Sequence, residues 1–126
     1  MLSNSRIYIF KISYKGKEWI SSLDANELSS LLANIIKTSI KDLKIKDIKI
    51  INSYRSGIYS SEIHIDKLKY RERRILSKEQ ISELRKILRQ QLRKINEFTY
   101  EQIHIVNDEF TRKPTEAFLT EDSLHV

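Results

Sequence analysis

The chain alternates between segments in which every second residue is apolar and segments in which apolar residues recur every three or four positions. The first pattern is typical of half-buried strands and the second of amphipathic helices. Alternating segments at 7–19, 48–54, 58–70 and 100–106 therefore predict four strands. The first is interrupted at Gly16, where we expect a hairpin turn, and the second ends at a turn near Ser56–Gly57.

Two helices are predicted between these strands. Apolar residues recur at helical spacing from Leu28 to Ile40 and again from Ile81 to Ile95. Asp24–Glu27 and Ser77–Gln80 have the form of a capping box, in which the first side chain accepts a backbone N–H and the fourth reaches back. These two motifs predict where the helices begin. We find no internal repeat in the sequence.

The order strand, helix, strand, strand, helix, strand predicts one α+β domain with a ferredoxin-like βαββαβ sandwich, an antiparallel sheet with two helices on one face. In that fold the first and third strands are central and the last lies beside the first. We expect the domain to span residues 1–110, followed by an acidic tail at 111–126. Without the first strand, the order also approaches that of KH-type RNA-binding modules, but their GxxG loop is absent.

Composition removes several classes of site. The 126 residues include no cysteine, which excludes disulfides, thiolate nucleophiles and sulfur-ligated zinc. Two glycines are too few for the glycine-rich loops that cradle nucleotide phosphates. Neither a signal peptide nor an apolar run of the roughly 18 residues needed to cross a bilayer is present. We therefore expect a cytoplasmic protein with no cofactor and no metal.

The formal net charge of +6 hides a strong asymmetry along the chain. Residues 1–66 carry +3, residues 67–95 carry +8 and residues 96–126 carry −5. Strand periodicity would place four basic residues along one side of an extended ribbon, and helical periodicity would place five more within about 100° of one another. The ribbon residues are Lys67, Lys69, Arg71 and Arg73, and the helix residues are Lys78, Arg85, Lys86, Arg89 and Arg93.

Two adjacent basic rows form a surface that attracts phosphate backbones by counterion release. Basic side chains on the outer face of a helix can equally serve solubility alone. We expect Tyr70 to stack on a base beside the phosphate contacts. The predicted nucleic-acid-binding residues are Lys67, Lys69, Tyr70, Arg71, Arg73, Arg74, Arg85, Arg89 and Arg93.

The predicted order of elements is also that of the RNA-recognition motif, and the first strand resembles part of that family's signature. Ile7–Ile12 has the apolar and aromatic pattern of that family's first signature strand, with Tyr8 placed to stack on a base. Ser60–Ile65 lacks the glycine and paired aromatics of the other signature, so the family is not assigned. We expect instead that Tyr8, Phe10, Ile12 and Tyr14 pack beneath the helices.

The tripeptide Ile-His-Ile occurs twice, around His64 and around His104. Both histidines should lie on the uncovered sheet face with one strand between them, too far apart for one metal ion. Glu62 and Asp66 flank His64 and, together with His104, form the one acid–base group that the sequence suggests; a hydrolase would use His64 with Glu62 or Asp66. This is the weakest hypothesis, because no nucleophile or oxyanion loop accompanies them.

These observations favour a non-enzymatic nucleic-acid-binding accessory protein. RNA or a ribonucleoprotein is favoured over DNA because no recognition-helix arrangement is evident. The alternative is a protein–protein adaptor or inhibitor, possibly of the phage or plasmid type, that acts through the open sheet face and the tail. That face could also mediate a homodimer, with the amphipathic residues Trp19, Tyr8, Tyr14 and Tyr59 at the interface.

Overall fold

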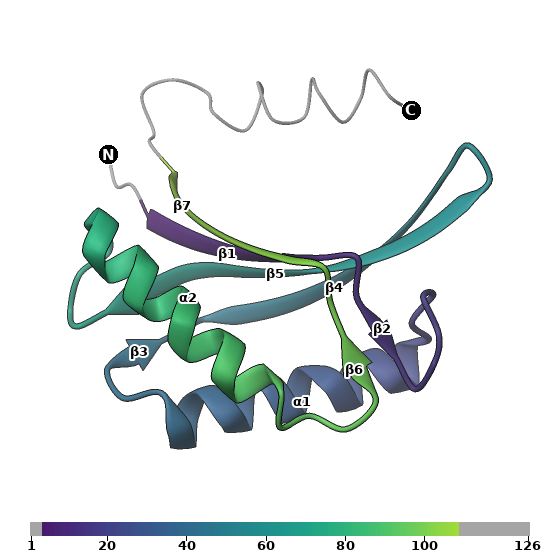
Figure 1. Cartoon of the computed structure of the whole chain (residues 1–126), viewed down its shortest axis with the longest axis horizontal. Coiled ribbons are helices and arrows are strands. Elements are labelled where there is room, and N and C mark those ends of the chain that lie inside the picture. Colours follow the sequence, from purple (N-terminus) through teal and green to yellow (C-terminus); the bar gives the residue numbers. More distant parts are fainter. Residues whose placement is uncertain (1–3, 109–126) are drawn as a thin grey trace.

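An antiparallel sheet lies over two helices, both on the same face, in a mixed α+β arrangement (Figure 1). The computed structural model describes residues 4–108; the predicted acidic tail at 111–126 lies outside them. The long elements are β1 (Asn4–Phe10), α1 (Ser22–Ser39), β4 (Asp47–Arg55), β5 (Ile58–Tyr70), α2 (Lys78–Leu92) and β7 (Gln102–Asp108). Three two-residue strands, which periodicity could not predict, are β2 (Ser13–Tyr14), β3 (Leu43–Lys44) and β6 (Phe98–Thr99).

The four long strands pair in an order that makes β1 and β5 the inner strands. β5 pairs with β4 on one side and β1 on the other, and β1 also pairs with β7, in every case antiparallel. The last strand, β7, therefore lies beside the first strand, β1, as predicted. β3 extends the sheet beside the end of β5, and β2 pairs with β6 in a separate ribbon. No helix among the described residues is long and apolar enough to cross a membrane.

The two helix starts were predicted with unequal success. α2 begins with the expected capping box, in which the Ser77 hydroxyl accepts the Gln80 N–H and the Gln80 side chain accepts the Ser77 N–H. The box predicted at Asp24–Glu27 is wrong, because α1 begins earlier and its N-cap is Ser21. The Ser21 hydroxyl accepts the Asp24 N–H at 3.1 Å, and Asp24 lies in the first turn, where a negative charge favours the helix dipole.

Strand alternation decides which side chains enter the core. Ile7 and Ile9 face the helices and are fully buried, so Tyr8 and Phe10 lie on the opposite face. The expectation that these two aromatics pack beneath the helices is therefore wrong. Lys11 has a φ of 52°, which shifts the alternation by one residue and returns the chain to the core side. Ile12 and Tyr14 are buried there, as expected for them.

The two halves of the chain repeat one β-α-β design at an offset of about 56 residues, so the expectation of no internal repeat is wrong. Helix positions 28, 32 and 36 correspond to 84, 88 and 92, all buried leucine or isoleucine. Left-handed residues recur as well, with φ of 52° at Lys11 and 53° at Lys67. In both halves a two-residue reversal closes on paired backbone hydrogen bonds, between Tyr14 and Lys17 and between Tyr70 and Arg73.

A matched pair of asparagines shows how closely the halves agree. The Asn52 amide accepts the Ile20 N–H at 3.1 Å and donates to the Ile20 carbonyl at 2.8 Å. The Asn107 amide accepts the Leu76 N–H at 3.0 Å and donates to the Leu76 carbonyl at 2.9 Å. A buried serine donates to each asparagine, Ser61 to Asn52 and Ser5 to Asn107. Each asparagine thus fixes the segment that leads into a helix to the last strand of its own half.

The repeat gives the sheet an approximate two-fold axis. Tyr8 and His64 occupy equivalent positions in the two halves and are direct partners in the β1–β5 register. The axis therefore passes between them, perpendicular to the sheet. Some equivalent positions have different residue types in the two halves, and these positions include the residues of the candidate site.

Candidate nucleic-acid interface

One side of α2 carries a row of basic residues that we call the basic flank: Lys78, Arg85, Lys86, Arg89 and Arg93. Leu84, Leu88 and Leu92 form the adjoining stripe of the helix and are buried in the core. Arg85 is half-buried and the other four side chains are exposed. Within residues 4–108 none of the five forms an ion pair. Helical periodicity therefore predicted this row correctly.

The first half of the chain has no such row. The positions equivalent to Arg85, Lys86, Arg89 and Arg93 are Ser29, Ser30, Ala33 and Lys37. On α1 these residues line a groove of about 870 Å³ beside the segment that links β3 to β4. By the two-fold relation, the basic flank lies on the β7 side of α2. The flank is thus a difference between two otherwise matched halves.

The predicted basic ribbon does not exist as one row. β5 ends at Tyr70, and Lys67 has a φ of 53°, which breaks the alternation within the strand. Arg71 and Glu72 then have φ of 53° and 65° and reverse the chain toward Arg73. Strand periodicity cannot hold across these left-handed residues. The side chains of Lys67, Lys69, Arg71 and Arg73 therefore do not share one side of an extended segment.

Arg71 and Tyr70 have structural partners. The Tyr70 ring is 1% exposed and its hydroxyl donates to Glu83, so a base cannot stack on it; that prediction is wrong. Burial, with the Glu83 hydrogen bond adding to it, raises the pKa of Tyr70 to about 12. The Arg71 guanidinium lies 3.1 Å from a Glu83 oxygen and 5.3 Å from the Tyr70 ring centre.

The first half contains the same cluster, made of Tyr14, Lys15 and Glu27. The Tyr14 hydroxyl donates to Glu27, and Lys15 lies 2.8 Å from a Glu27 oxygen. The hydrogen bond from Lys15, followed by the one from Tyr14, lowers the pKa of Glu27. Because both halves build this cluster, Arg71 belongs to the framework of the fold rather than to a surface specific to the second half.

The remaining predicted residues lie in two places near the end of β5. Arg73 and Arg74 are exposed in the segment that leads into α2, and the Arg74 carbonyl accepts a hydrogen bond from Ser5. Lys67 is exposed and Lys69 is half-buried, opposite Lys44 of β3. The basic side chains at the start of α2 therefore come from a turn and from the helix flank, not from a ribbon.

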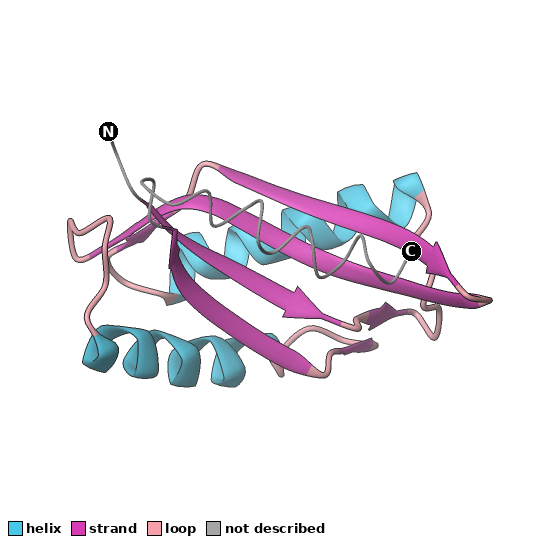
Figure 2. Cartoon of the chain, turned by 90° about the horizontal axis from the view of Figure 1, so that it is seen from above, coloured by secondary structure: helices cyan, strands magenta, loops and turns pink. Residues whose placement is uncertain are grey.

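The sheet face opposite the helices carries a cluster of rings (Figure 2 views this face from above). One row across the sheet consists of His64, Tyr8 and His104, which are successive partners in the strand register. The rings of Tyr8 and His64 meet edge to face at 4.8 Å, and those of Phe10 and His104 at 5.1 Å. The expected placement of both histidines on this face, with β1 between them, is confirmed.

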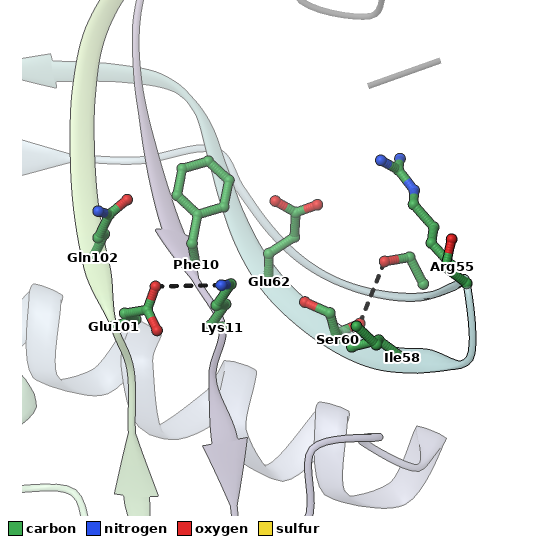
Figure 3. A pocket seen from close by; sticks show the side chains of 10 residues that line it. Phe10, Lys11, Arg55, Ile58, Ser60, Glu62, Glu101 and Gln102 are labelled. Carbon is green, nitrogen blue, oxygen red and sulfur yellow. Dashed lines mark hydrogen bonds and ion pairs between the residues drawn. The ribbon is translucent and has the colours of Figure 1, made fainter. Parts of the chain in front are cut away.

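The charges on this open face are mixed. Arg6 forms an ion pair with Asp66 at 3.7 Å, and His64 Nε2 lies 3.4 Å from a Glu62 oxygen without forming a hydrogen bond. Toward the β4–β5 turn, the face has an open pocket of about 690 Å³ in which Lys11 pairs with Glu101 at 3.5 Å (Figure 3). Acidic and basic groups alternate here, so this face attracts a polyanion less strongly than the basic flank does.

The geometry around His64 does not support the hydrolase hypothesis. Asp66 is held by Arg6, and the nearest ring to His64 is that of Tyr8. No serine or threonine is hydrogen-bonded to His64 among the described residues. Within the same residues no group of three or more histidine or acidic side chains is placed to hold a metal ion.

A second aromatic cluster lies on the arm formed by the outer halves of β4 and β5. Tyr59 contacts Trp19 at 5.2 Å and Tyr54 at 4.6 Å between ring centres, and all three are about half exposed. The sequence had suggested a single interface from Trp19, Tyr59, Tyr8 and Tyr14. The structure separates them, because Tyr8 lies on the open face and Tyr14 is buried.

Comparison of the chain with protein-family models, with curated proteins and with solved structures finds no significant match.

Proposed function

We propose that this protein is a non-enzymatic accessory protein that binds the phosphate backbone of a nucleic acid, with RNA or a ribonucleoprotein favoured, through the basic flank of α2. The observation that carries the proposal is the row Arg85, Arg89 and Arg93, exposed or half-exposed and without an ion-pair partner in the described part of the chain. Such a row gains affinity for phosphates mainly by releasing their condensed counterions.

The comparison between the halves supports this proposal against a purely solubilising role. Positions equivalent to Arg85 and Arg89 are Ser29 and Ala33, in a half that keeps the same core, caps and asparagine bonds. Solubility alone gives no reason to concentrate arginine on one of two matched helices. Arginine also suits phosphate recognition, because its planar guanidinium donates two parallel hydrogen bonds.

We also propose that the framework is a ferredoxin-like βαββαβ sandwich to which β2, β3 and β6 are short additions. The antiparallel pairings of β4 with β5, β5 with β1 and β1 with β7 support it, as does the position of both helices on one face. In this framework the flank of α2 can lie along a phosphate backbone. β3, β4 and β5 separate α1 from α2 in the chain, so the two helices are not a helix-turn-helix unit of the kind that reads bases in the DNA major groove. This supports RNA over base-specific DNA recognition.

The test is a fluorescence-anisotropy titration of single-stranded RNA, duplex RNA and duplex DNA at two salt concentrations. Arg85→Glu/Arg89→Glu should reduce RNA affinity at least tenfold and lower the slope of log affinity against log salt by about 1.4 to 1.8, the amount two phosphate contacts contribute. The three nucleic acids, titrated in parallel, rank the substrates.

A matched control removes the effect of net charge. Lys37→Glu/Lys41→Glu changes the net charge by the same amount but on exposed residues at the end of α1. It should leave the salt slope unchanged and lower affinity only slightly. Equal losses in the two variants, or no RNA binding at low salt, would overturn the proposal. The variant Arg71→Glu is unsuitable here, because it breaks the contact with Glu83.

The open sheet face supports a second candidate, a protein adaptor or inhibitor. Tyr8 and Phe10 lie on this face in contact with His64 and His104 instead of in the core. Half-buried aromatic rings beside charged groups are typical of protein interfaces. In this case Phe10→Ala would abolish capture of a protein partner, whereas Arg85→Glu/Arg89→Glu would leave it intact.

A further inference from the structure

We propose that two copies of this chain associate through the β4 strands, antiparallel across a two-fold axis at Ile51, so that their sheets become continuous. This interface is separate from the phosphate site and does not depend on it. It also differs from the open-face homodimer expected from the sequence.

β4 is an edge strand with a long unpaired side. Its nine residues, Asp47–Arg55, pair only with β5 among the strands of residues 4–108. Along an antiparallel ladder every second residue points its N–H and C=O away from the existing partner. Such an edge readily adds another strand unless something covers it. On the β4 side the described residues place no further strand.

Exposed apolar side chains are concentrated on this same arm. Ile51 is 37% exposed, Tyr54 57% and Ile58 67%, with Tyr59 and Trp19 beside them. An exposed apolar group next to an open edge is a feature that monomeric proteins avoid. In the dimer, Ile51 would meet its own copy and Tyr54 would lie opposite Ile48 of the second copy.

Full pairing and the charges on β4 together favour one register. If all nine residues pair, the strand is centred on Ile51, and Asp47 then lies opposite Arg55 of the second copy, on the same sheet face. The same register pairs Lys49 with the neutral Ser53. A shift by two residues that brought Lys49 opposite Arg55 would instead set like charges together. Full pairing and charge complementarity thus favour the same arrangement.

The helix beneath this edge has small residues at the positions that a second copy would approach. A two-fold axis perpendicular to the sheet keeps both α1 helices on the same side, facing each other below the joined strands. On the side of α1 toward β4, the middle of the helix has the small residues Ser29, Ser30 and Ala33. The rest of the groove described above has both basic and acidic side chains, from Lys37, Lys41, Lys44, Lys46, Asp42, Asp47 and Glu72. The β7 side of α2 has Arg85, Lys86 and Arg89 at the equivalent helix positions, where two like-charged flanks would repel. At these helix positions the difference between the halves therefore favours the β4 edge over the β7 edge as the interface.

The experiment is sedimentation equilibrium of the full chain over a range of concentrations. The wild type should form a dimer. Asp47→Arg and Arg55→Asp, which each place like charges opposite one another twice per dimer, should each weaken dimerisation about tenfold. The double variant Asp47→Arg/Arg55→Asp restores opposite charges and should recover the wild-type dissociation constant.

The two-fold relation within the chain supplies the control. Gln102 is the β7 position equivalent to Asp47, so Gln102→Arg adds a positive charge at the other edge. It should leave the dimer unchanged. A wild type that remains monomeric, a dimer indifferent to the single charge reversals, or a double variant no better than the single ones would each overturn the proposal.

Discussion

The asparagine pair offers the sharpest test of the repeated design. Replacing Asn107 by alanine removes the hydrogen bonds to the Leu76 N–H (3.0 Å) and carbonyl (2.9 Å), together with the acceptor of the Ser5 hydroxyl. Each bond contributes about 1 kcal/mol, and a buried polar group left without a partner costs about 1 to 3 kcal/mol. Because Asn107 is half-buried, water replaces part of this loss. The free energy of unfolding should fall by about 2 to 4 kcal/mol.

The equivalent change, Asn52→Ala, removes the same bonds around Ile20 and Ser61 and should cost a similar amount. Urea unfolding followed by circular dichroism measures both, with the midpoint moving by about 1 to 2 M for a domain of this size. Asn34→Ala, on the exposed side of α1, is the control and should leave the midpoint within about 0.3 M of wild type. Losses below about 0.5 kcal/mol at both sites, or a loss at one site only, would refute the reasoning.

Two further predictions concern stability. The folded state raises the pKa of Tyr70 to about 12. The neutral Tyr70 side chain therefore contributes fully to the free energy of unfolding below the ordinary pKa of 10, and this contribution is lost as the pH rises from 10 to 12. The free energy of unfolding should therefore fall by about 2 kcal/mol between about pH 9 and about pH 11.5, and Tyr70→Phe should remove that part of the decline in urea titrations at the two values. Gly57, at a φ of +80° in the β4–β5 turn, has no neighbouring atom within 4 Å of an added Cβ, so Gly57→Ala should cost only the left-handed strain, about 1 kcal/mol in thermal unfolding. Gly57→Asn should cost less, and equal costs would contradict the strain argument.

Periodicity predicted the elements but not the points where the backbone leaves regular geometry. The turn at Ser56–Gly57 and the α2 capping box have short-range signatures and were predicted correctly. Lys11 and Lys67 are left-handed without any glycine signal, so neither the displaced alternation after them nor the failure of the basic ribbon was visible in the sequence.

The repeat was missed because the halves agree mainly at residues that hold the framework and differ on the surface. The two Ile-His-Ile tripeptides are the most visible repeated motif, but they do not occupy equivalent positions in the two halves. His64 corresponds to Tyr8, and His104 corresponds to Lys49. The useful signal was the recurrence of identical residues at nearly the same offset, such as Tyr14 with Tyr70 and Asn52 with Asn107. Only their shared contacts show that these pairs have one role.

The basic flank was predictable because α2 is regular from Lys78 to Leu92, so the angle of each side chain follows from its position alone. The sequence could not show that Tyr70 and Arg71 both contact Glu83, because Glu83 lies in the next element. A basic residue in a charge-rich segment cannot be assigned to binding until the acidic groups near it in space are known.

The most direct test of the proposed function is the salt dependence of RNA affinity, measured by anisotropy for the wild type, Arg85→Glu/Arg89→Glu and Lys37→Glu/Lys41→Glu. A phosphate site on the basic flank predicts a slope that falls by about 1.4 to 1.8 in the first variant and is unchanged in the second. Identical slopes in all three proteins would contradict it.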